Sequence, residues 1–324
     1  MLVWQPLEPY LAGIKKISYS PAGKLYGIAF HALPCNTDQL LIDKYQLQQY
    51  VSTRQIALRA QGDLLKPGDI VLFGNPSFNM DSAAIAKQRK SESISITIPG
   101  ERGSRGMPWQ ELPGTAEEIK IISDLFTKNN IRTAMYTKTE ASEENLKALG
   151  GHSPPIMHIA THGFFLPMPD KQLKNTKPDQ GTSFTLADDP LIRSGLIMAG
   201  GNYAWSGKTP IEGVEDGVVT AYEIAQLNLG RTALVSLSAC ETGLGDIQGS
   251  EGVFGLQRSF KMAGVNKMLV SLWQVPDRET VELMTSFYSY WLGGKSISAS
   301  FYQAQGEMRR KYPPYYWAAF VLVE

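Results

Sequence analysis

Short apolar runs that end in turn residues alternate along this chain with stretches of helical periodicity. The first clear run covers residues 69–73 and is closed by Gly74, Asn75 and Pro76. Later runs of the same kind lie at residues 132–136, 156–161, 233–239, 267–272 and 318–323. Strands that alternate with helices are typical of βαβ units, whose strands lie parallel in one sheet. We therefore expect an α/β fold with a mostly parallel central sheet of about six strands.

The chain has 324 residues, which suits one large domain or two lobes that share a core. Residues 1–67 precede the first clear strand and contain β-like runs at 15–19 and 25–30. We predict an N-terminal β-containing subdomain over residues 1–67 and the main α/β domain over residues 68–324.

The run at 156–161 is separated from the run at 233–239 by about 70 residues. This exceeds the ~10–15 residues of most structureless loops. We therefore expect the segment to contain elements of its own, among them a helix at residues 218–226.

Three helix starts are predicted from capping residues. Thr115 and Glu118 have the spacing of a capping box, and Ile119, Ile122 and Phe126 follow on one helix face. Ser250 and Asp277 each precede a further helical pattern and are candidate N-caps.

Charge and cysteine content exclude several classes of protein. Lys and Arg number 31 and equal the 31 Asp and Glu, so no overall positive field attracts nucleic acid. Two cysteines cannot form a disulfide framework. The chain begins without a basic signal-peptide region and has no apolar run of ~18 residues. These features predict a cytoplasmic protein that binds neither nucleic acid nor membrane directly.

Two of the predicted strands end in reactive side chains. One leads to His162 and Gly163, and another leads to Cys240 and a glycine-rich turn. Chemistry in open parallel sheets takes place beyond the carboxyl ends of the strands. If the two strands are neighbours, the thiol and the imidazole face each other, which suits acyl transfer by a cysteine nucleophile. The backbone N–H groups of Gly163 and Cys240 are candidates for the oxyanion hole.

These residues lie within stretches that resemble the CHAT domain of bacteria, a branch of the caspase-like and separase-like cysteine peptidases. The opening SYSPAGKLYGIAFHALP resembles the N-terminal segment of that family. The other similar stretches are HIATHGFF, DGVVTAYEI, LSACETGLGD, GSEGVFGLQRSFKMAGVNKMLVSLWQV and YYWAAFVLVE. The resemblance implies a caspase-like three-layer α/β/α sandwich, a Cys240–His162 dyad and hydrolysis of peptide bonds in a protein substrate without a cofactor.

The same resemblance implies regulation. CHAT domains usually follow helical repeats that sense a signal or a partner, and some members act in bacterial immunity, beside CRISPR effectors or upstream of gasdermin pores. We therefore expect a regulatory sensor or partner of the helical-repeat or CRISPR-effector type.

Three acidic residues are candidates for a pocket that binds a basic side chain of the substrate. Asp246 and Glu251 follow the cysteine closely, and Asp216 precedes a predicted helix. Several members of the clan prefer a basic residue before the cleaved bond, although CHAT members vary. A loop of basic and polar residues at 87–105 is a candidate for self-cleavage, or else a solvated surface loop.

Other readings of the motifs remain open or are rejected. A catalytically quiet interaction module could keep the same scaffold. Gly243, Gly245 and Gly249 resemble a loose dinucleotide-binding fingerprint, but their spacing does not fit G-x-G-x-x-G. His158 and His162 on one strand would stand roughly 13 Å apart, so we predict no metal site. His158 is expected to be a hydrogen-bonded core residue and Cys35 a non-catalytic thiol.

Overall fold

The central sheet contains the strands that the sequence predicts. The computed structural model describes residues 3–58, 66–85, 107–166, 191–208, 211–238 and 249–324, with the backbone alone for 249–254. Within them an eight-stranded sheet has the order β1-β2-β11-β10-β9-β5-β3-β4, and every neighbouring pair is parallel except β10 with β11. The strands are β1 (Lys16–Tyr19), β2 (Gln46–Gln49), β3 (Ile70–Pro76), β4 (Thr133–Lys138), β5 (Ile156–Ala160), β9 (Leu234–Leu237), β10 (Lys267–Ser271) and β11 (Phe320–Val323). Six of these strands lie in the predicted main domain and confirm the predicted α/β sheet: β3, β4, β5, β9, β10 and β11.

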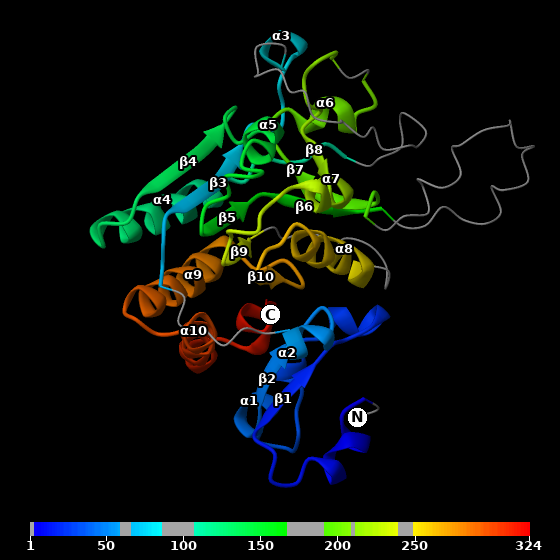
Figure 1. The fold of residues 1–324 in the computed structure, drawn as a ribbon, viewed down its shortest axis with the longest axis vertical. Helices are drawn as coiled ribbons and strands as arrows, with labels where there is room; N and C mark the ends of the chain where they lie inside the picture. The colour runs from blue at the N-terminus through cyan, green and yellow to red at the C-terminus, as the bar shows by residue number, and fades with distance from the viewer. Residues whose placement is uncertain (1–2, 59–65, 86–106, 167–190, 209–210, 239–248) are drawn as a thin grey trace, which may run out of the picture.

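Helices cover both faces of this sheet, as a three-layer sandwich requires (Figure 1). One side carries α4 (Pro113–Lys128), α9 (Asp277–Leu292) and α10 (Ile297–Lys311), and the other carries α7 (Ala221–Gln226) and α8 (Gly249–Met262). The central strands β5, β9 and β10 are buried along their whole length. Strands covered on both faces are continuous apolar runs, which explains why the sequence shows them clearly.

The predicted helix caps are wrong in detail. Leu112 is the N-cap of α4, and Thr115 lies in the first turn, where its hydroxyl donates to the Leu112 carbonyl over 2.7 Å. Glu118 is buried instead of capping the helix. Proline suits the first helical position because it has no N–H to satisfy, so the helix starts at Pro113. Asp277 and Ser250 likewise lie inside their helices, in the first turns of α9 and α8.

A second, antiparallel sheet occupies the long segment between β5 and β9, which confirms that this segment has structure of its own. Its order is β6-β7-β8, with β6 (His162–Phe165), β7 (Ser194–Ile197) and β8 (Val218–Thr220). The helix predicted at 218–226 is wrong over its first three residues, which are β-branched and form β8. The helix α7 then begins behind a capping box of Thr220 and Glu223.

The N-terminal unit extends the central sheet through β2, which pairs with β11. The run at 15–19 is a strand as expected, whereas the run at 25–30 is wrong, because η2 (Gly23–Gly27) and η3 (Phe30–Ala32) are 3₁₀ turns. Strand β2 was not predicted, because its sequence, QLQQ, is polar although three of its residues are buried. The subdomain boundary after residue 67 stays a prediction. Shorter helices are η1 (Gln5–Tyr10), α1 (Leu41–Lys44), α2 (Arg54–Leu58), α3 (Ser82–Ile85), α5 (Glu143–Lys147), α6 (Gly201–Trp205) and α11 (Pro314–Trp317).

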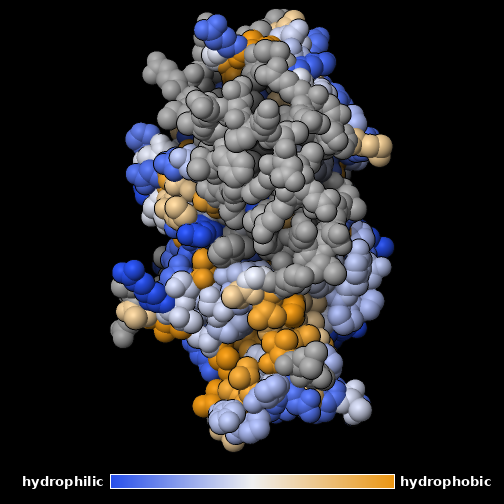
Figure 2. Space-filling model, turned by 90° about the vertical axis from the view of Figure 1, so that its right-hand side faces the viewer, coloured by the Kyte–Doolittle hydropathy of each residue, from blue (hydrophilic) through white to orange (hydrophobic). Residues whose placement is uncertain are grey.

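Apolar side chains remain on the surface of the N-terminal unit. Figure 2 shows them gathered on the lower part of one face. No residue of η1 is buried. The exposed large apolar residues of this unit are Val3, Leu7, Tyr10, Ile14 and Ile56. None of the helices in the described residues combines the length and apolar character that crossing a membrane needs.

Candidate active site

The strands that lead to the two candidate catalytic residues are neighbours. Strand β5 pairs in parallel with β9, with Ile159 opposite Leu237, and the Ser238 N–H donates to the Ile159 carbonyl over 3.0 Å. The carboxyl ends of the two strands therefore meet at one edge of the central sheet. Thr161 alone separates the end of β5 from His162, and Ser238 is the last described residue before Cys240. Cys240 and Asp246 lie outside the described residues, and of Glu251 the structure describes only the backbone, in the first turn of α8.

His162 is the first residue of β6 and is buried, with 3% of its surface exposed. Its Nε2 lies 2.8 Å from the carbonyl oxygen of Gln110. A carbonyl accepts only, so Nε2 carries the proton in this contact, and Nδ1 is the basic nitrogen of the neutral ring. The sequence alone did not indicate Gln110, because any residue has a backbone carbonyl.

Two aromatic rings pack against the imidazole of His162. The Phe78 ring lies 5.1 Å from it and the Trp109 ring 5.0 Å, between ring centroids. Trp205 packs edge-on against Trp109 at 5.1 Å. Aromatic pairs at such distances favour defined orientations. The ring of His162 is therefore fixed by packing as well as by its hydrogen bond.

The backbone of Gly163 is directed away from β7. In an antiparallel pair, residues alternate between those that exchange hydrogen bonds and those that do not. The Leu166 N–H donates to the Arg193 carbonyl over 2.6 Å, so the alternation places Gly163 and Leu196 at a non-hydrogen-bonded pair. Because β6 is the edge strand of the small sheet, the N–H of Gly163 faces the outer edge of that sheet. This geometry suits a donor to a bound group.

Asp216 lies two residues before β8, whose first residue, Val218, is in register with the start of β6 across the small sheet. His162 pairs with Ile197, and Ile197 pairs with Val218, whose N–H donates to Asp216 over 2.9 Å. Burial raises the pKa of Asp216 to about 7, and the charges of Glu223 and Glu215 add to this shift, whereas the hydrogen bond from Val218 and the Lys147 ammonium oppose it.

A buried group of carboxylates surrounds Lys147 beside Asp216. The Lys147 ammonium lies 2.7 Å from Glu143, 2.9 Å from Glu215 and 3.0 Å from Glu223. Among the described residues these three carboxylates have the spacing to hold a metal ion, but the lysine nitrogen is their cation. Burial raises the pKa of Glu143 well above its usual range. Glu143 also accepts from the Gly217 N–H over 2.9 Å, so the cluster fixes the loop that contains Asp216.

His158 is a hydrogen-bonded core residue, as predicted. It is fully buried, with Nε2 3.1 Å from Glu118 and Nδ1 3.2 Å from the Tyr288 hydroxyl. Tyr288 donates to Ser236 over 3.0 Å, and Ser238 donates to Glu118 over 3.1 Å. This polar chain beneath the sheet therefore ends at the last described residue before Cys240. The sequence did not indicate this role of Glu118.

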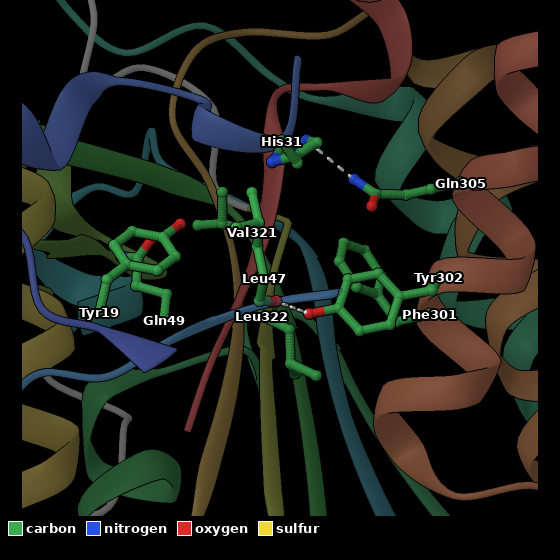
Figure 3. Close-up of a pocket in the computed structure, with 9 residues that line it drawn as sticks. All are labelled: Tyr19, His31, Leu47, Gln49, Phe301, Tyr302, Gln305, Val321 and Leu322. Carbon is green, nitrogen blue, oxygen red and sulfur yellow. Dashed lines mark hydrogen bonds between the residues drawn. The ribbon is translucent and has the colours of Figure 1, made fainter. Parts of the chain in front are cut away.

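The cavity in Figure 3 is not part of this site. It lies between β1, β2, β11 and α10, and it leaves about 20 Å³ for the centres of water molecules, which is room for one or two waters. His31 lies against it and faces Gln305, and burial lowers the His31 pKa to about 4. Cys35, the other cysteine, lies on the N-terminal unit and donates to the Gln39 carbonyl over 3.3 Å.

Comparison with known families places the whole chain. The CHAT domain model matches residues 1–324. The chain belongs to the CHAT domain family. Tetratricopeptide repeat protein 28 of Homo sapiens is 23% identical over 312 residues, which are 93% of this chain and 12% of that protein. The Mus musculus protein of the same name is 25% identical over 263 residues, 74% of this chain and 10% of that protein. The chain thus spans about a tenth of the curated relatives that it matches.

Solved structures of cysteine proteinases share the fold. The Arg-specific cysteine proteinase gingipain R (RgpB) gives a TM-score of 0.53 at 9% identity, over 98% of this chain and 66% of that one. The complex of the Porphyromonas gingivalis RgpB pro- and mature domains gives 0.51 at 10% identity, with the same coverage. The caspase-like α/β fold of this CHAT domain is therefore confirmed.

Proposed function

We propose that this CHAT domain is a cysteine endopeptidase that hydrolyses peptide bonds in a protein substrate, with Cys240 as nucleophile and His162 as general acid and base. The observation that carries the proposal is the pairing of β5 with β9, because these strands lead to the two residues. Two peptide units separate Ser238 from Cys240 and span at most about 7 Å. In the proposal, the thiol of Cys240 therefore lies near the edge of the sheet where β5 leads to His162.

The proposed reaction follows from the groups available. His162 Nδ1 takes the proton of the Cys240 thiol, and the thiolate attacks the peptide carbonyl carbon. The N–H groups of Gly163 and Cys240 donate to the oxyanion of the tetrahedral intermediate. His162 then gives its proton to the leaving amine as the C–N bond breaks, leaving a thioester. Water activated by His162 hydrolyses the thioester and regenerates the thiol.

The Gln110 carbonyl supports this role of His162. It holds the proton on Nε2 and so leaves Nδ1 as the base, and it stabilises the imidazolium that forms during the reaction. No cofactor takes part in the proposed reaction.

For the substrate we propose a basic residue before the cleaved bond, with Asp216, Asp246 and Glu251 as the candidate acidic residues of its pocket. Asp216 lies two residues before Val218, which is in register with the start of β6. The structural relative gingipain R is described as an Arg-specific cysteine proteinase. Peptides that differ only in Arg, Lys, Leu or Asp before the cleaved bond test this preference, with Asp216→Asn and Asp246→Asn compared side by side. Equal cleavage of all four peptides would contradict it.

The cleavage pattern on a diverse peptide library tests the activity itself. We expect the wild-type chain to cleave a subset of peptides, and Cys240→Ala and His162→Ala to lose several orders of magnitude in rate, because members of a dyad act as a unit. A folded wild-type chain whose Cys240 reacts with iodoacetamide no faster than Cys35 at mildly acidic pH, and which cleaves nothing, would contradict the proposal. It would favour the quiet interaction module.

We also propose that a sensor or partner controls the peptidase, in the cytoplasm and in the setting of bacterial immunity. The curated relatives are named for their tetratricopeptide repeats, and this chain matches only about a tenth of their length. A chain whose Cys240 is alkylated rapidly but which cleaves its peptides only slowly when alone would support such control. Full activity of the chain alone would contradict it. Intact masses of wild-type and Cys240→Ala protein test self-cleavage in the loop at 87–105, which lies outside the described residues.

A further inference from the structure

The segment at residues 107–112 supplies two of the contacts that hold His162. It contains the Trp109 ring, which packs against the imidazole. It also contains the Gln110 carbonyl, which accepts a hydrogen bond from the Nε2–H of His162. The segment has no helical or strand structure of its own before α4 begins. The position of this segment therefore depends on hydrogen bonds to other parts of the chain, and not on hydrogen bonds within a helix or a sheet.

The side chain of Asn202 makes hydrogen bonds to both backbone groups of Trp109. The Trp109 N–H donates to Asn202 Oδ1 over 2.8 Å, and Asn202 Nδ2 donates to the Trp109 carbonyl over 2.9 Å. The same Nδ2 donates its second proton to Asn79 Oδ1 over 2.8 Å. Asn202 is buried, with 7% of its surface exposed. The Asn202 amide thus provides both the acceptor and the donor that the backbone of a neighbouring strand would provide in a sheet.

The backbone around Asn202 is attached to the end of β3. Asn202 N–H donates to the Phe78 carbonyl over 3.2 Å, and Gly200 N–H donates to the Ser77 carbonyl over 2.9 Å. Asn202 also lies in the first turn of α6, between Gly200 and Trp205. The amide is therefore presented from a fixed part of the fold.

Only an amide of this length fits both contacts. The Trp109 N–H needs an acceptor and its carbonyl needs a donor, so the orientation of the Asn202 amide is determined. An aspartate has the same shape and accepts from the N–H, but it cannot donate to the carbonyl of Trp109 or to Asn79. A buried carbonyl left facing a carboxylate is repelled and loses its hydrogen bond.

We propose that Asn202 is a positioning residue for His162, which acts through the backbone of Trp109 by fixing the Gln110 carbonyl that holds the imidazole. This inference rests on the proposed peptidase function, because it assigns Asn202 to the same site. It goes beyond that function in naming the group that positions the general base. Asn202 touches neither Cys240 nor substrate in the proposal.

The chain offers a matched control for the test. Asn202→Asp removes the donor half of the contact and adds a negative charge. Asn79→Asp adds the same charge next to it but keeps Oδ1 as the acceptor for Asn202, because Asn79 receives a hydrogen bond through that atom. Asn202→Ala removes both halves without adding charge. Thermal unfolding and circular dichroism identify which variants are folded.

Two readouts separate positioning from folding and from the proposed function. In protein with ¹⁵N-labelled histidine, which has four such residues, the His162 ring is assigned by comparison with His162→Gln. We expect the Nε2–H tautomer in wild type and Asn79→Asp, and a mixture with Nδ1–H in folded Asn202→Asp. The kcat for peptide cleavage should fall by about 10²-fold with KM little changed. Asn79→Asp should keep both properties.

The outcomes are distinguishable. A wild-type chain without peptidase activity contradicts the proposed function, but the ring resonances of His162 still decide the role of Asn202. Folded Asn202→Asp with the tautomer of the wild type overturns the inference, as does an altered tautomer with unchanged kcat. Failure of both Asn202 variants to fold also overturns it, because Asn202 would then be required for folding instead of for positioning.

Discussion

At the scale of single residues, Asp216 is a carboxyl group whose surroundings oppose its ionisation. Burial is the main cause, and Glu223 and Glu215 add negative charge nearby, while Lys147 is shared among three other carboxylates. With more carboxylates than cations in the cluster, the proton held by Asp216 in the folded protein contributes to stability. That contribution depends on pH.

The pKa of Asp216 gives the direction of the pH dependence. The folded value of about 7 lies above the ordinary value of 3.8, so the folded state holds a proton that the unfolded state has released between these pH values. The stabilisation is complete below about pH 4 and is lost as pH rises through 7. We expect Asp216→Asn, which keeps the acceptor for Val218, to gain free energy of unfolding relative to wild type from pH 5 to pH 8.

Urea unfolding at the two pH values measures this difference. Asp124→Asn on the exposed face of α4 is the control, because it removes a carboxylate that is exposed to solvent and leaves the cluster around Asp216 unchanged. An Asp216→Asn variant with the same pH slope as wild type would refute the raised pKa.

At this scale the sequence predicts side chains with a chemical signature and not those with a purely geometric role. His162 stays a predicted site residue, which the sequence indicates because a histidine followed by glycine at a strand end is recognisable. His158 was predicted correctly, because an imidazole inside an apolar strand is typical of a hydrogen-bonded core residue. The Gln110 carbonyl, Asn202 and Glu118 were missed. Their roles depend on which distant segments the fold brings together, and the spacing of residues along the chain does not predict such contacts.

At the scale of elements, the small sheet determines where His162 lies, and its packing leaves no room at Gly195. A Cβ there would lie 2.1 Å from the Val219 carbonyl oxygen and 2.7 Å from the Phe164 ring. Strand β7 pairs with β6 on one side and β8 on the other, so neither neighbour can move away alone. The glycine is required by the close approach of three strands.

We expect Gly195→Ala to lower the free energy of unfolding by about 1–3 kcal/mol or more, because overpacking forces the backbone to shift. Since the shift displaces β6, the rate of peptide cleavage should fall as well. Gly306→Ala is the matched control: its Cβ meets nothing within 4 Å, and it lies inside α10, so it should stabilise by about 0.5–1 kcal/mol. Chemical denaturation of the two variants measures the change in the free energy of unfolding. Equal changes in both variants would show that crowding at β7 is unimportant.

Elements were predicted well where burial imposes one pattern on the sequence, and poorly where polar side chains are buried. Five of the six strands of the main domain are buried apolar runs, whereas the edge strand β4 has no buried residue. Strand β2 contains three glutamines and one leucine, and two of the glutamines are buried and hydrogen-bonded within the fold, so its pattern resembles a loop. The segment at 218–226 changes from strand to helix at Thr220. Helical periodicity can be detected only over a stretch of sequence longer than either element, so the sequence pattern did not show the change.

At the scale of the whole molecule, Glu324 joins the N-terminal unit to the main domain. Its carboxylate lies 3.1 Å from the Lys267 ammonium and accepts from Ser298 over 2.7 Å. From β2, Gln48 donates to it over 3.4 Å, and the hydroxyl of Tyr50 lies at the same distance. Lys267 and Glu324 each have only 2% of their side chain exposed. One buried ion pair thus connects β10, β11, α10 and β2.

Removing one member of this pair leaves a buried charge without its partner. We expect Lys267→Met to lower the free energy of unfolding by about 3–5 kcal/mol, whereas the exposed pair of Lys311 and Glu282 should contribute under about 1 kcal/mol when Lys311→Met breaks it. The double variant Lys267→Met/Glu324→Gln removes both charges and keeps an acceptor for Ser298. It should therefore be more stable than Lys267→Met despite its additional substitution.

Urea unfolding of the wild type and of the variants Lys267→Met, Glu324→Gln and Lys267→Met/Glu324→Gln completes the double-mutant cycle. Losses that simply add would show that Glu324 is stabilised without Lys267, and that the N-terminal unit is held by strand pairing and apolar contacts alone.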